Sequence, residues 1–293
     1  MDGVIVVDKP EGMTSHDVVN RVRRLAGTRR VGHLGTLDPM ATGVLPLVVG
    51  RATRMAQFFT ASEKSYDAAI QFGCATNTYD RDGAPITERV APSFSREELE
   101  RALGEFRGTI LQTPPPVSAK KVAGVPSYKL ARKQMAVELK PVEVTIHALE
   151  LVEFDGACAR VLVRCSSGTY VRAIAHDLGQ GLGCGAFVGA LRRTASGDFR
   201  EEQAKTLDEL RALAEAGSLA QALVPAAELL PEFPCEMVDT VTAGMIRQGR
   251  DFRLSPFRKR ADARHVKALT RDGDLVAIGE ARLPNVYHPV VVL

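Results

Sequence analysis

A carboxylate in an unusual setting is the first candidate for chemistry. Asp38 lies within residues 31–43, VGHLGTLDPMATG, a segment with three glycines and one proline. These residues disfavour a regular helix or a central strand, whereas the apolar side chains between them are too many for a solvated linker. Pro39 pushes the backbone of Asp38 towards extended conformations and so limits where its carboxylate can point. A carboxylate fixed among apolar neighbours suggests a chemical role, and the alternative is an Asx-turn residue that satisfies local backbone groups.

An arginine far along the chain is the second candidate. The sequence predicts a helix that starts at Thr169, with Ala173, Ile174 and Leu178 on its inner side, which places Arg172 in the first turn. A cation near a helix N-terminus is disfavoured by the helix macrodipole. We therefore expect Arg172 to face an anion.

The elements around these residues indicate a mixture of helices and strands. The β-branched residues 4–7 predict a strand, and Thr14 or Ser15 can cap a helix whose apolar residues extend to Leu25 and which ends at Gly27. Residues 45–49 and 66–72 predict strands, and residues 51–59 a helix. The Asp38 loop is therefore expected to join a helix to a strand.

The sequence predicts further helices and strands along the chain. Ser95 and Glu98 form a capping-box pattern before a helix at residues 97–103. Residues 142–154 and 159–165 predict a strand pair around a turn at Asp155 and Gly156. Residues 186–194 predict a strand that ends in Leu-Arg-Arg, and residues 207–214 predict a helix.

Two segments carry most of the basic bias, which matters because the net charge is only +3. Residues 113–141 hold three consecutive prolines and six lysines or arginines against a single acid, and they predict an insertion with one basic face. Residues 265–270, 275–280 and 290–293 predict short strands of a small β-barrel. Its many basic residues, which include Lys267, fit phosphate binding, although a solvated basic surface is the alternative.

Composition limits the remaining classes. A chain of 293 residues with 45% hydrophobic and 25% charged residues predicts one large globular domain with a small appendage. Five cysteines without a C-x-x-C pair predict reduced thiols. No signal peptide or membrane-length apolar run is present, so a cytoplasmic location is expected. The six histidines lack metal-ligand spacing, and we expect no metal.

Four sequence blocks, in order, resemble the motifs of the TruB-type pseudouridine synthases, which isomerise a uridine in the T loop of transfer RNA. They are VDKPEGMTS at residues 7–15, GHLGTLDPMATG at 32–43, KSY at 64–66 and SGTYVR at 167–172. The insertion is similar to the family loop that lies against RNA, although Val117 replaces a usual aromatic residue and Val125-Pro126 a more basic pair. The likeness extends to about residue 230 and is weaker beyond.

The resemblance implies an α+β fold in two domains. Residues 1–231 would form a mixed, mainly antiparallel sheet catalytic domain of the pseudouridine-synthase type, with residues 113–141 as its RNA-contacting insertion. Residues 232–293 would form a small PUA-like β-barrel that binds RNA.

The resemblance also implies a catalytic trio of Asp38, Tyr66 and Arg172. Asp38 would be the nucleophile or charge stabiliser, acting on the ribose anomeric carbon or on the uracil ring. Arg172 would keep that carboxylate ionised through two charge-assisted hydrogen bonds. Tyr66 would stack on the extruded uracil and could move a proton. The alternative for Tyr66 is a strand residue that only packs in the core.

Further residues gain roles by the same resemblance. His33 would fill the space left by the flipped base, and Leu191 would line the uracil pocket. The alternatives are an imidazole bonded within its own loop and a plain core leucine. RNA contacts are expected from Lys120, Lys121, Lys129 and Arg132, and support of the Asp38 loop from Lys9, Pro10, Gly32, Gly35 and Pro39.

The implied reaction needs no cofactor, and the implied partner is the T stem-loop of transfer RNA, with the target at position 55. No membrane and no obligate protein partner are expected. One rival is an RNA-binding or RNA-folding protein on the same scaffold without catalysis, which the intact trio disfavours. The other is a guide-RNA-dependent pseudouridine synthase, which the self-sufficient basic insertion and the small carboxy-terminal domain disfavour.

Overall fold

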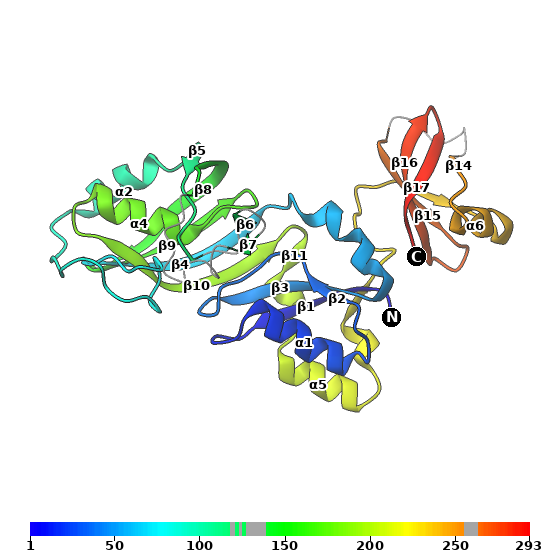
Figure 1. Cartoon of the computed structure of the whole chain (residues 1–293), viewed down its shortest axis with the longest axis horizontal. Helices are drawn as coiled ribbons and strands as arrows, with labels where there is room; N and C mark the ends of the chain where they lie inside the picture. Colours follow the sequence, from blue (N-terminus) through cyan, green and yellow to red (C-terminus); the bar gives the residue numbers. More distant parts are fainter. Residues whose placement is uncertain (118–120, 123–124, 127–138, 255–262) are drawn as a thin grey trace.

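The computed structural model describes residues 1–117, 121–122, 125–126, 139–254 and 263–293, and it has the mixed α+β fold that the sequence predicts (Figure 1). Its largest unit is a ten-stranded sheet with the strand order β12-β1-β3-β10-β4-β9-β8-β5, in which β2 also pairs with β3 and β11 with β10. The bounds are β1 (Gly3–Lys9), β2 (Val31–His33), β3 (Thr42–Val49), β4 (Lys64–Phe72), β5 (Gly108–Gln112), β8 (Val142–Phe154), β9 (Cys158–Cys165), β10 (Ala186–Ser196), β11 (Phe199–Arg200) and β12 (Leu223–Pro225).

Helices share an apolar core with one face of this sheet. They are α1 (Ser15–Leu25), α2 (Arg96–Gly104), α4 (Val171–Gly181) and α5 (Leu207–Glu215). Thr14 and Ser95 close capping boxes at the starts of α1 and α2, which confirms both predicted helix starts. The helix expected at residues 51–59 is present as the 3-10 helix η1 (Gly50–Phe59). Two further 3-10 helices are η2 (Glu201–Gln203) and η3 (Leu219–Ala222). In the described part of the chain, no helix is long and apolar enough to span a membrane.

The first strand lies between two cores. Ile5 and Val7 belong to the core beneath the helices, whereas Val4 and Val6 belong to a second core on the opposite face. A continuous apolar run of this kind is typical of a strand buried on both faces. The second core also contains η1 residues and part of the carboxy-terminal sheet.

The large sheet has a narrow junction between its two halves. β3 and β10 pair in parallel at two positions, Arg192 with Thr42 and Arg193 with Gly43. The other named strand pairs described in this sheet are antiparallel. Gly43 has a φ of +97°, and a Cβ there would lie 2.3 Å from the Arg193 carbonyl oxygen, so only glycine fits.

The Asp38 loop begins differently from the prediction. Residues 31–33 form β2 and pair with β3, so the loop joins two strands and not a helix to a strand. Glycine weakens a strand interior, but here the ladder with β3 and the buried Val31 outweigh that local preference.

The sequence predicts a small β-barrel for the carboxy-terminal residues. In the structure they form a five-stranded sheet that curls into a half-barrel (Figure 1). Its third predicted strand starts at residue 286 and not 290, because a two-residue turn at Pro284 and Asn285 returns the chain directly into the hairpin. The elements are β13 (Cys235–Met237), α6 (Thr240–Arg247), β14 (Phe252–Arg253), β15 (His265–Leu269), β16 (Leu275–Leu283) and β17 (Val286–Val292).

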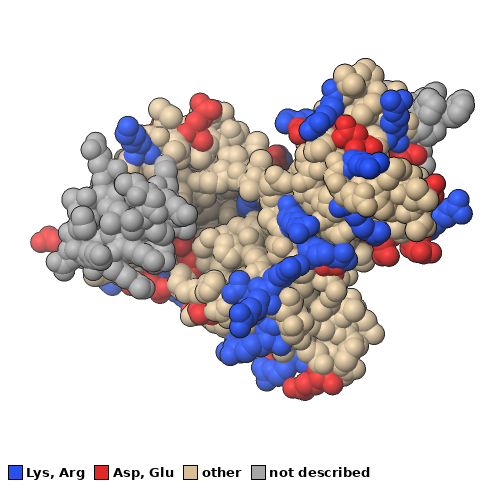
Figure 2. All heavy atoms as spheres, turned by 45° about the vertical axis from the view of Figure 1, so that its right-hand side comes forward, with Lys and Arg blue, Asp and Glu red and all other residues tan. Residues whose placement is uncertain are grey.

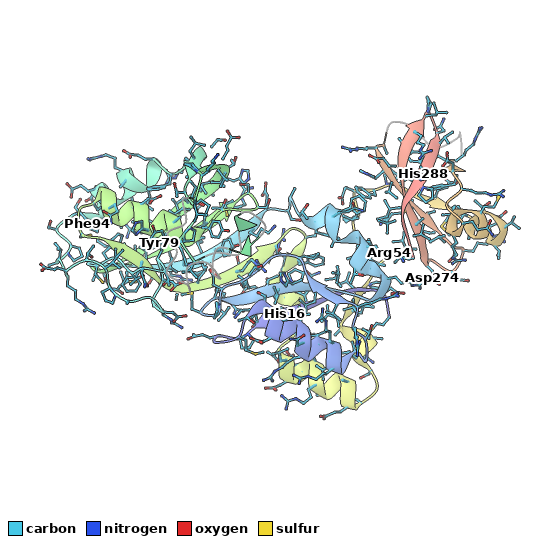
Figure 3. The ribbon with its side chains drawn as sticks, viewed as in Figure 1. His16, Arg54, Tyr79, Phe94, Asp274 and His288 are labelled. Carbon is cyan, nitrogen blue, oxygen red and sulfur yellow. The ribbon has the colours of Figure 1, made fainter. Side chains whose placement is uncertain are left out.

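The two sheets share contacts. Ile278 and Val291 lie in the second core together with Val4 and Val6. Arg54 of η1 reaches across and donates a hydrogen bond of 2.6 Å to the Val292 carbonyl (Figure 3). The division of the chain at residues 231 and 232 stays a prediction.

Lys267 does not have the role that its charge suggested. Its side chain is buried, and Nζ donates hydrogen bonds of 2.8 and 2.9 Å to the carbonyls of Ala227 and Leu229. These bonds tie β15 to the segment that enters the carboxy-terminal sheet, so Lys267 is not available to a phosphate.

Candidate active site

A cavity of about 390 Å³ lies beside the junction of β3 and β10. Its walls come from the Asp38 loop, η1, β4, β10 and the turn that leads into α4. The lining includes four residues singled out from the sequence for substrate roles or catalysis besides Asp38, namely His33, Tyr66, Arg172 and Leu191. Segments that are far apart in the sequence therefore converge on one pocket.

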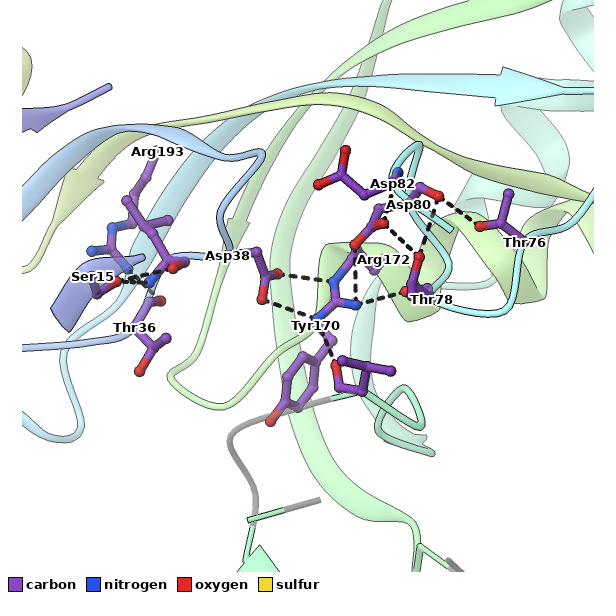
Figure 4. Close-up of polar contacts among 12 residues, drawn as sticks. Ser15, Thr36, Asp38, Thr76, Thr78, Asp80, Asp82, Tyr170, Arg172 and Arg193 are labelled. Carbon is purple, nitrogen blue, oxygen red and sulfur yellow. Dashed lines mark hydrogen bonds and ion pairs between the residues drawn. The ribbon is translucent and has the colours of Figure 1, made fainter. Parts of the chain in front are cut away.

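Asp38 and Arg172 meet in this pocket, as predicted. Asp38 Oδ2 lies 2.9 Å from Arg172 Nε, and Arg172 Nη2 donates a hydrogen bond of 3.1 Å to Asp38 Oδ1 (Figure 4). The Arg172 side chain is 3% exposed, whereas that of Asp38 is 32% exposed. The carboxylate is thus held on one side and open on the other.

A second carboxylate, which the sequence did not suggest, shares the same guanidinium. Arg172 Nη1 lies 3.3 Å from Asp80 Oδ2 and donates a hydrogen bond of 2.6 Å to the Thr78 carbonyl. Thr78 Oγ1 donates in turn to Asp80 Oδ1. Tyr79 between them has a φ of +64°, and its ring stacks on His176 of α4 at 3.7 Å between centroids.

The charge balance around Asp38 is uneven. Burial raises the pKa of the Asp38 carboxyl above its usual value, and the Asp80 charge raises it further. Arg172 and, to a smaller extent, Lys9 oppose the rise. One guanidinium between two carboxylates neutralises Asp38 only in part, which keeps its charge available to a ligand.

Two buried side chains, Lys9 and Ser15, form hydrogen bonds with the backbone of the Asp38 loop. Lys9 Nζ donates hydrogen bonds of 2.8 Å to the Pro10 carbonyl and 3.1 Å to the Pro39 carbonyl. Burial lowers the pKa of Lys9 to about 8, and Asp38 opposes that change. Ser15, which the sequence suggested only as a helix cap, bonds both the N–H and the carbonyl of Leu37.

The predicted glycines have different roles. Gly35 has a φ of +140°, in the region that favours glycine, and its carbonyl accepts a hydrogen bond from Arg193, while its role in supporting the loop stays a prediction. Gly32 is part of β2, paired with Val48 of β3.

The pocket walls carry the other predicted contacts. Burial raises the pKa of the Tyr66 hydroxyl, and Leu191 is buried beside the cavity. Burial lowers the pKa of His33, which favours the neutral imidazole. In the described part of the chain, the buried His33 Nδ1 has no hydrogen-bond partner. This atom therefore gives no support to the alternative that the His33 imidazole is hydrogen-bonded within its own loop.

Arg193 is a pocket residue that the sequence reasoning missed. Its strand alternates, so Leu191 and Arg193 point to the same side, and that spacing was a usable signal. Asp80 had no comparable signal, since it lies in a turn with a positive φ at the preceding residue.

The expected RNA contacts of the insertion cannot be placed. Lys120, Lys129 and Arg132 lie outside the described residues, and Lys121 is described only through the backbone of the β6 (Lys121–Val122) and β7 (Val125–Pro126) pair.

A basic surface instead appears on α1. Arg21 and Arg24 line a cavity of about 200 Å³ with Arg211 of α5, and the exposed Arg29 and Arg30 follow after α1. We call Arg21, Arg24, Arg29 and Arg30 the α1 arginine surface. Figure 2 shows lysines and arginines gathered in a ridge on this side of the molecule.

Comparison with known proteins supports the resemblance. Residues 23–171 match the model of the TruB family pseudouridylate synthase N-terminal domain, and residues 172–231 match the tRNA pseudouridylate synthase B C-terminal domain. The chain is 60% identical to a Solibacter usitatus protein over the full length of both, and 39% identical to an Aquifex aeolicus protein over 96% of each. Both relatives are named tRNA pseudouridine synthase B.

Solved structures agree in fold. A chain of a Cbf5-Nop10-Gar1 complex aligns with 97% of this chain and 79% of its own length at 28% identity and a TM-score of 0.70. A chain of an H/ACA RNP bound to a substrate RNA containing 2'-deoxyuridine aligns with 99% of this chain and 84% of its own length at 26% identity and the same TM-score. With a family model that covers more than half of its length and a relative that is similar throughout, the chain belongs to the TruB family of pseudouridylate synthases.

Proposed function

We propose that this protein isomerises uridine to pseudouridine in the T loop of transfer RNA, at position 55, with Asp38 as nucleophile. The observation that carries the proposal is the Asp38 carboxylate, held by Arg172 at the wall of the pocket and one-third exposed to it. The names of the relatives, tRNA pseudouridine synthase B, support the substrate.

The reaction rearranges the substrate and transfers no external group. The bond from the ribose anomeric carbon to N1 breaks, the ring turns, a bond forms from the same carbon to C5, and the proton on C5 is replaced by one on N1. Asp38 attacks the anomeric carbon or the ring, and it returns as a carboxylate when the product forms. Arg172 opposes the protonation that desolvation favours, and it aims the carboxylate.

Tyr66 and Leu191 provide the walls for the uracil ring. Both line the cavity, and in the sheet Tyr66 lies in register with Arg193 two positions from Leu191. An aromatic face supports a base by stacking, and we assign the hydroxyl to proton transfer. No cofactor is needed for these steps.

The uridine must leave its RNA fold to enter this pocket, at a cost of a few kcal/mol of stacking. His33 lies at the start of the Asp38 loop, on the cavity wall. Its Nδ1 has no hydrogen-bond partner in the described part of the chain, so this atom is suited to bond a group of the RNA. We assign it to the space that the flipped base leaves.

RNA affinity would come from basic residues around the pocket. Lys120, Lys121, Lys129 and Arg132 of the insertion are proposed to contact the backbone of the T stem-loop. The α1 arginine surface is a further candidate, because its four side chains form no ion pair within the described residues, and Asp17 is the one acid whose pKa the Arg21 charge lowers there. The carboxy-terminal sheet, residues 232–293, is proposed as an RNA-binding domain.

A guide-RNA-dependent synthase is the second candidate, favoured by the structural likeness to chains of the two complexes. That likeness comes with 26–28% identity, whereas the relative that matches the full length is 60% identical and is named for transfer RNA. We therefore propose an enzyme that needs no protein partner.

The test is incubation of the purified chain alone with an unmodified transfer RNA transcript, followed by mapping of pseudouridine. Product at position 55, and its absence from a transcript with cytidine there, are expected. Binding without product would indicate an RNA-folding protein. Product that requires added guide RNA and partner proteins would indicate the second candidate.

A further inference from the structure

Arg193 occupies the junction between the two halves of the sheet. Its backbone is in register with Gly43 of β3 on one side and with Tyr66 of β4 on the other. The pairing with β4 shifts register directly after Arg193. A substitution at Arg193 would therefore affect β3 and β4 together.

The Arg193 side chain is 1% exposed and binds the ends of the Asp38 loop. Nε donates a hydrogen bond of 2.7 Å to the Val44 carbonyl, Nη2 one of 3.1 Å to the Gly35 carbonyl, and Nη1 one of 3.4 Å to the Thr36 carbonyl. Gly35 and Thr36 precede Asp38 and Val44 follows it. The guanidinium thus closes the loop at its base.

Arg193 also faces Tyr66. Burial raises the pKa of the Tyr66 hydroxyl, and the positive charge of the neighbouring Arg193 guanidinium opposes the rise. Lys64 on the same strand faces Arg193, Cys165 of β9 faces Tyr66, and the Asp38 charge acts on Tyr66 as well. Arg193 therefore binds the Asp38 loop and lies in register beside Tyr66 on the neighbouring strand.

Arg193 forms no ion pair within the described ranges, and its guanidinium donates there to the carbonyl oxygens of Val44, Gly35 and Thr36. A buried guanidinium without a carboxylate carries a desolvation cost that an apolar residue would avoid. Its neighbour Arg192 shows the contrast, since Arg192 is half-buried and pairs with Asp8 and Glu201.

We propose that Arg193 is a positioning residue for the reaction, which fixes Asp38 and Tyr66 in one relative geometry around the uracil. The inference rests on the proposed function of the same pocket. Arg193 does not need to touch the substrate. It acts through the loop that carries the nucleophile and through the hydroxyl that faces it.

The test compares Arg193→Lys and Arg193→Met with the parent and with Arg192→Met, the matched control one residue away on β10. Each protein is examined for melting temperature, affinity for unmodified transfer RNA, and single-turnover formation of pseudouridine at saturating enzyme. Hydrogen exchange of residues 34–42 reports the loop. We expect both Arg193 variants to bind RNA within about threefold of the parent and to react at least about a hundredfold more slowly, with faster exchange in the loop.

A double variant separates positioning from general damage. If Arg193 acts through Tyr66, Arg193→Met combined with Tyr66→Phe should be no slower than the slower single variant. Strictly multiplicative losses, an unchanged rate in a folded Arg193 variant, or an equal loss in Arg192→Met would overturn the proposal. Failure of both Arg193 variants to fold would also overturn it, because Arg193 would then be a folding residue. An inactive parent would instead refute the proposed function.

Discussion

Asp38 and Asp80 lie on two sides of one guanidinium, 2.9 Å from Nε and 3.3 Å from Nη1 of Arg172. The two carboxylates therefore compete for one positive charge. Because Asp80 is nearly buried and Asp38 opens on the pocket, the incompletely neutralised charge is the one that a substrate can reach. This arrangement makes the ionisation of Asp38 the sensitive variable of the site.

Asp38→Asn should stop the chemistry and leave binding nearly intact. The amide keeps the size and hydrogen-bonding capacity of the carboxylate but is a far poorer nucleophile. Because affinity is expected from phosphate contacts over a wide surface, the Kd for transfer RNA should stay within about tenfold, or about 1.4 kcal/mol. Asp67→Asn on β4, whose side chain pairs with Arg160, is the control. A lower melting temperature with partial activity, above a deamidation control, would instead make Asp38 a turn residue.

The rate should rise with pH as Asp38 ionises. The pKa of the Asp38 carboxyl in the folded protein is raised above its usual value of 3.8, so folding favours the protonated acid. The contribution of Asp38 to the free energy of unfolding is therefore full below pH 3.8 and is lost as the pH rises through the pKa of the folded state. The single-turnover rate should increase across the same interval. Asp80→Asn removes a charge that raises this pKa, so it should move the acid limb to lower pH. A limb that moves upwards would contradict the assignment.

Tyr66 should contribute both its ring and its hydroxyl. Tyr66→Phe keeps the stacking face, so RNA affinity should hold while the single-turnover rate falls by about a hundredfold or more, in the range for loss of a proton-transfer group. Tyr66→Ala should lose the stacking as well, about 1–3 kcal/mol per base. Rates from quenched mixtures at saturating enzyme measure this. A phenylalanine variant with nearly the parent rate would reduce Tyr66 to a stacking platform.

The α1 arginine surface should contribute to RNA affinity and not to the chemical step. Replacing Arg21 and Arg24 with alanine removes two cations, so the slope of log Kd against log salt should fall by about one unit or more. The rate of the saturated complex should not change. The matched control replaces Arg96 and Arg101 of α2, which line no described cavity and carry the same charge. Equal slopes for the two double variants would show that α1 lies off the RNA path.

Gly43→Ala should destabilise the junction of the sheet. A Cβ at residue 43 would lie 2.3 Å from the carbonyl oxygen and 3.0 Å from the nitrogen of Arg193, in addition to the strain of a φ of +97°. The strain alone is worth about 1–3 kcal/mol. Gly27→Ala is the matched control, since its φ is +59° and its Cβ meets nothing within 4 Å. Urea unfolding should show a clearly larger loss for Gly43→Ala, and equal losses would contradict the close approach.

Local signals in the sequence identified many elements. The caps at Thr14 and Ser95, the alternating residues of β9 and the turn at Asp155 and Gly156 all depend on neighbours within a few positions. Such signals act through short-range hydrogen bonds and side-chain direction, which a sequence states directly. The motif around Asp38 also located the loop and its likeness to a family.

Contacts between distant segments were less accessible. Asp80 reaches Arg172 from a turn in which the preceding Tyr79 has a positive φ, and neither Asp80 nor Arg172 has a local pattern that signals the other. Lys267 looked like a phosphate ligand because its burial depends on the carbonyls of Ala227 and Leu229, 40 and 38 residues away. β2 was missed because its pairing with β3 overrides the turn preference of glycine.

The placement of β1 has a consequence for synthesis on the ribosome. β1 can pair with β3 early in synthesis. Its other edge stays unpaired until β12 (Leu223–Pro225) has been made, and Val4 and Val6 are not fully covered until Ile278 and Val291 have been made. At about 5–20 residues per second, that edge stays open for roughly ten to forty seconds. An exposed apolar strand edge is a template for wrong pairing. We therefore expect nascent chains released before residue 223 to aggregate, and chaperones that cover apolar strands to raise the yield of folded protein.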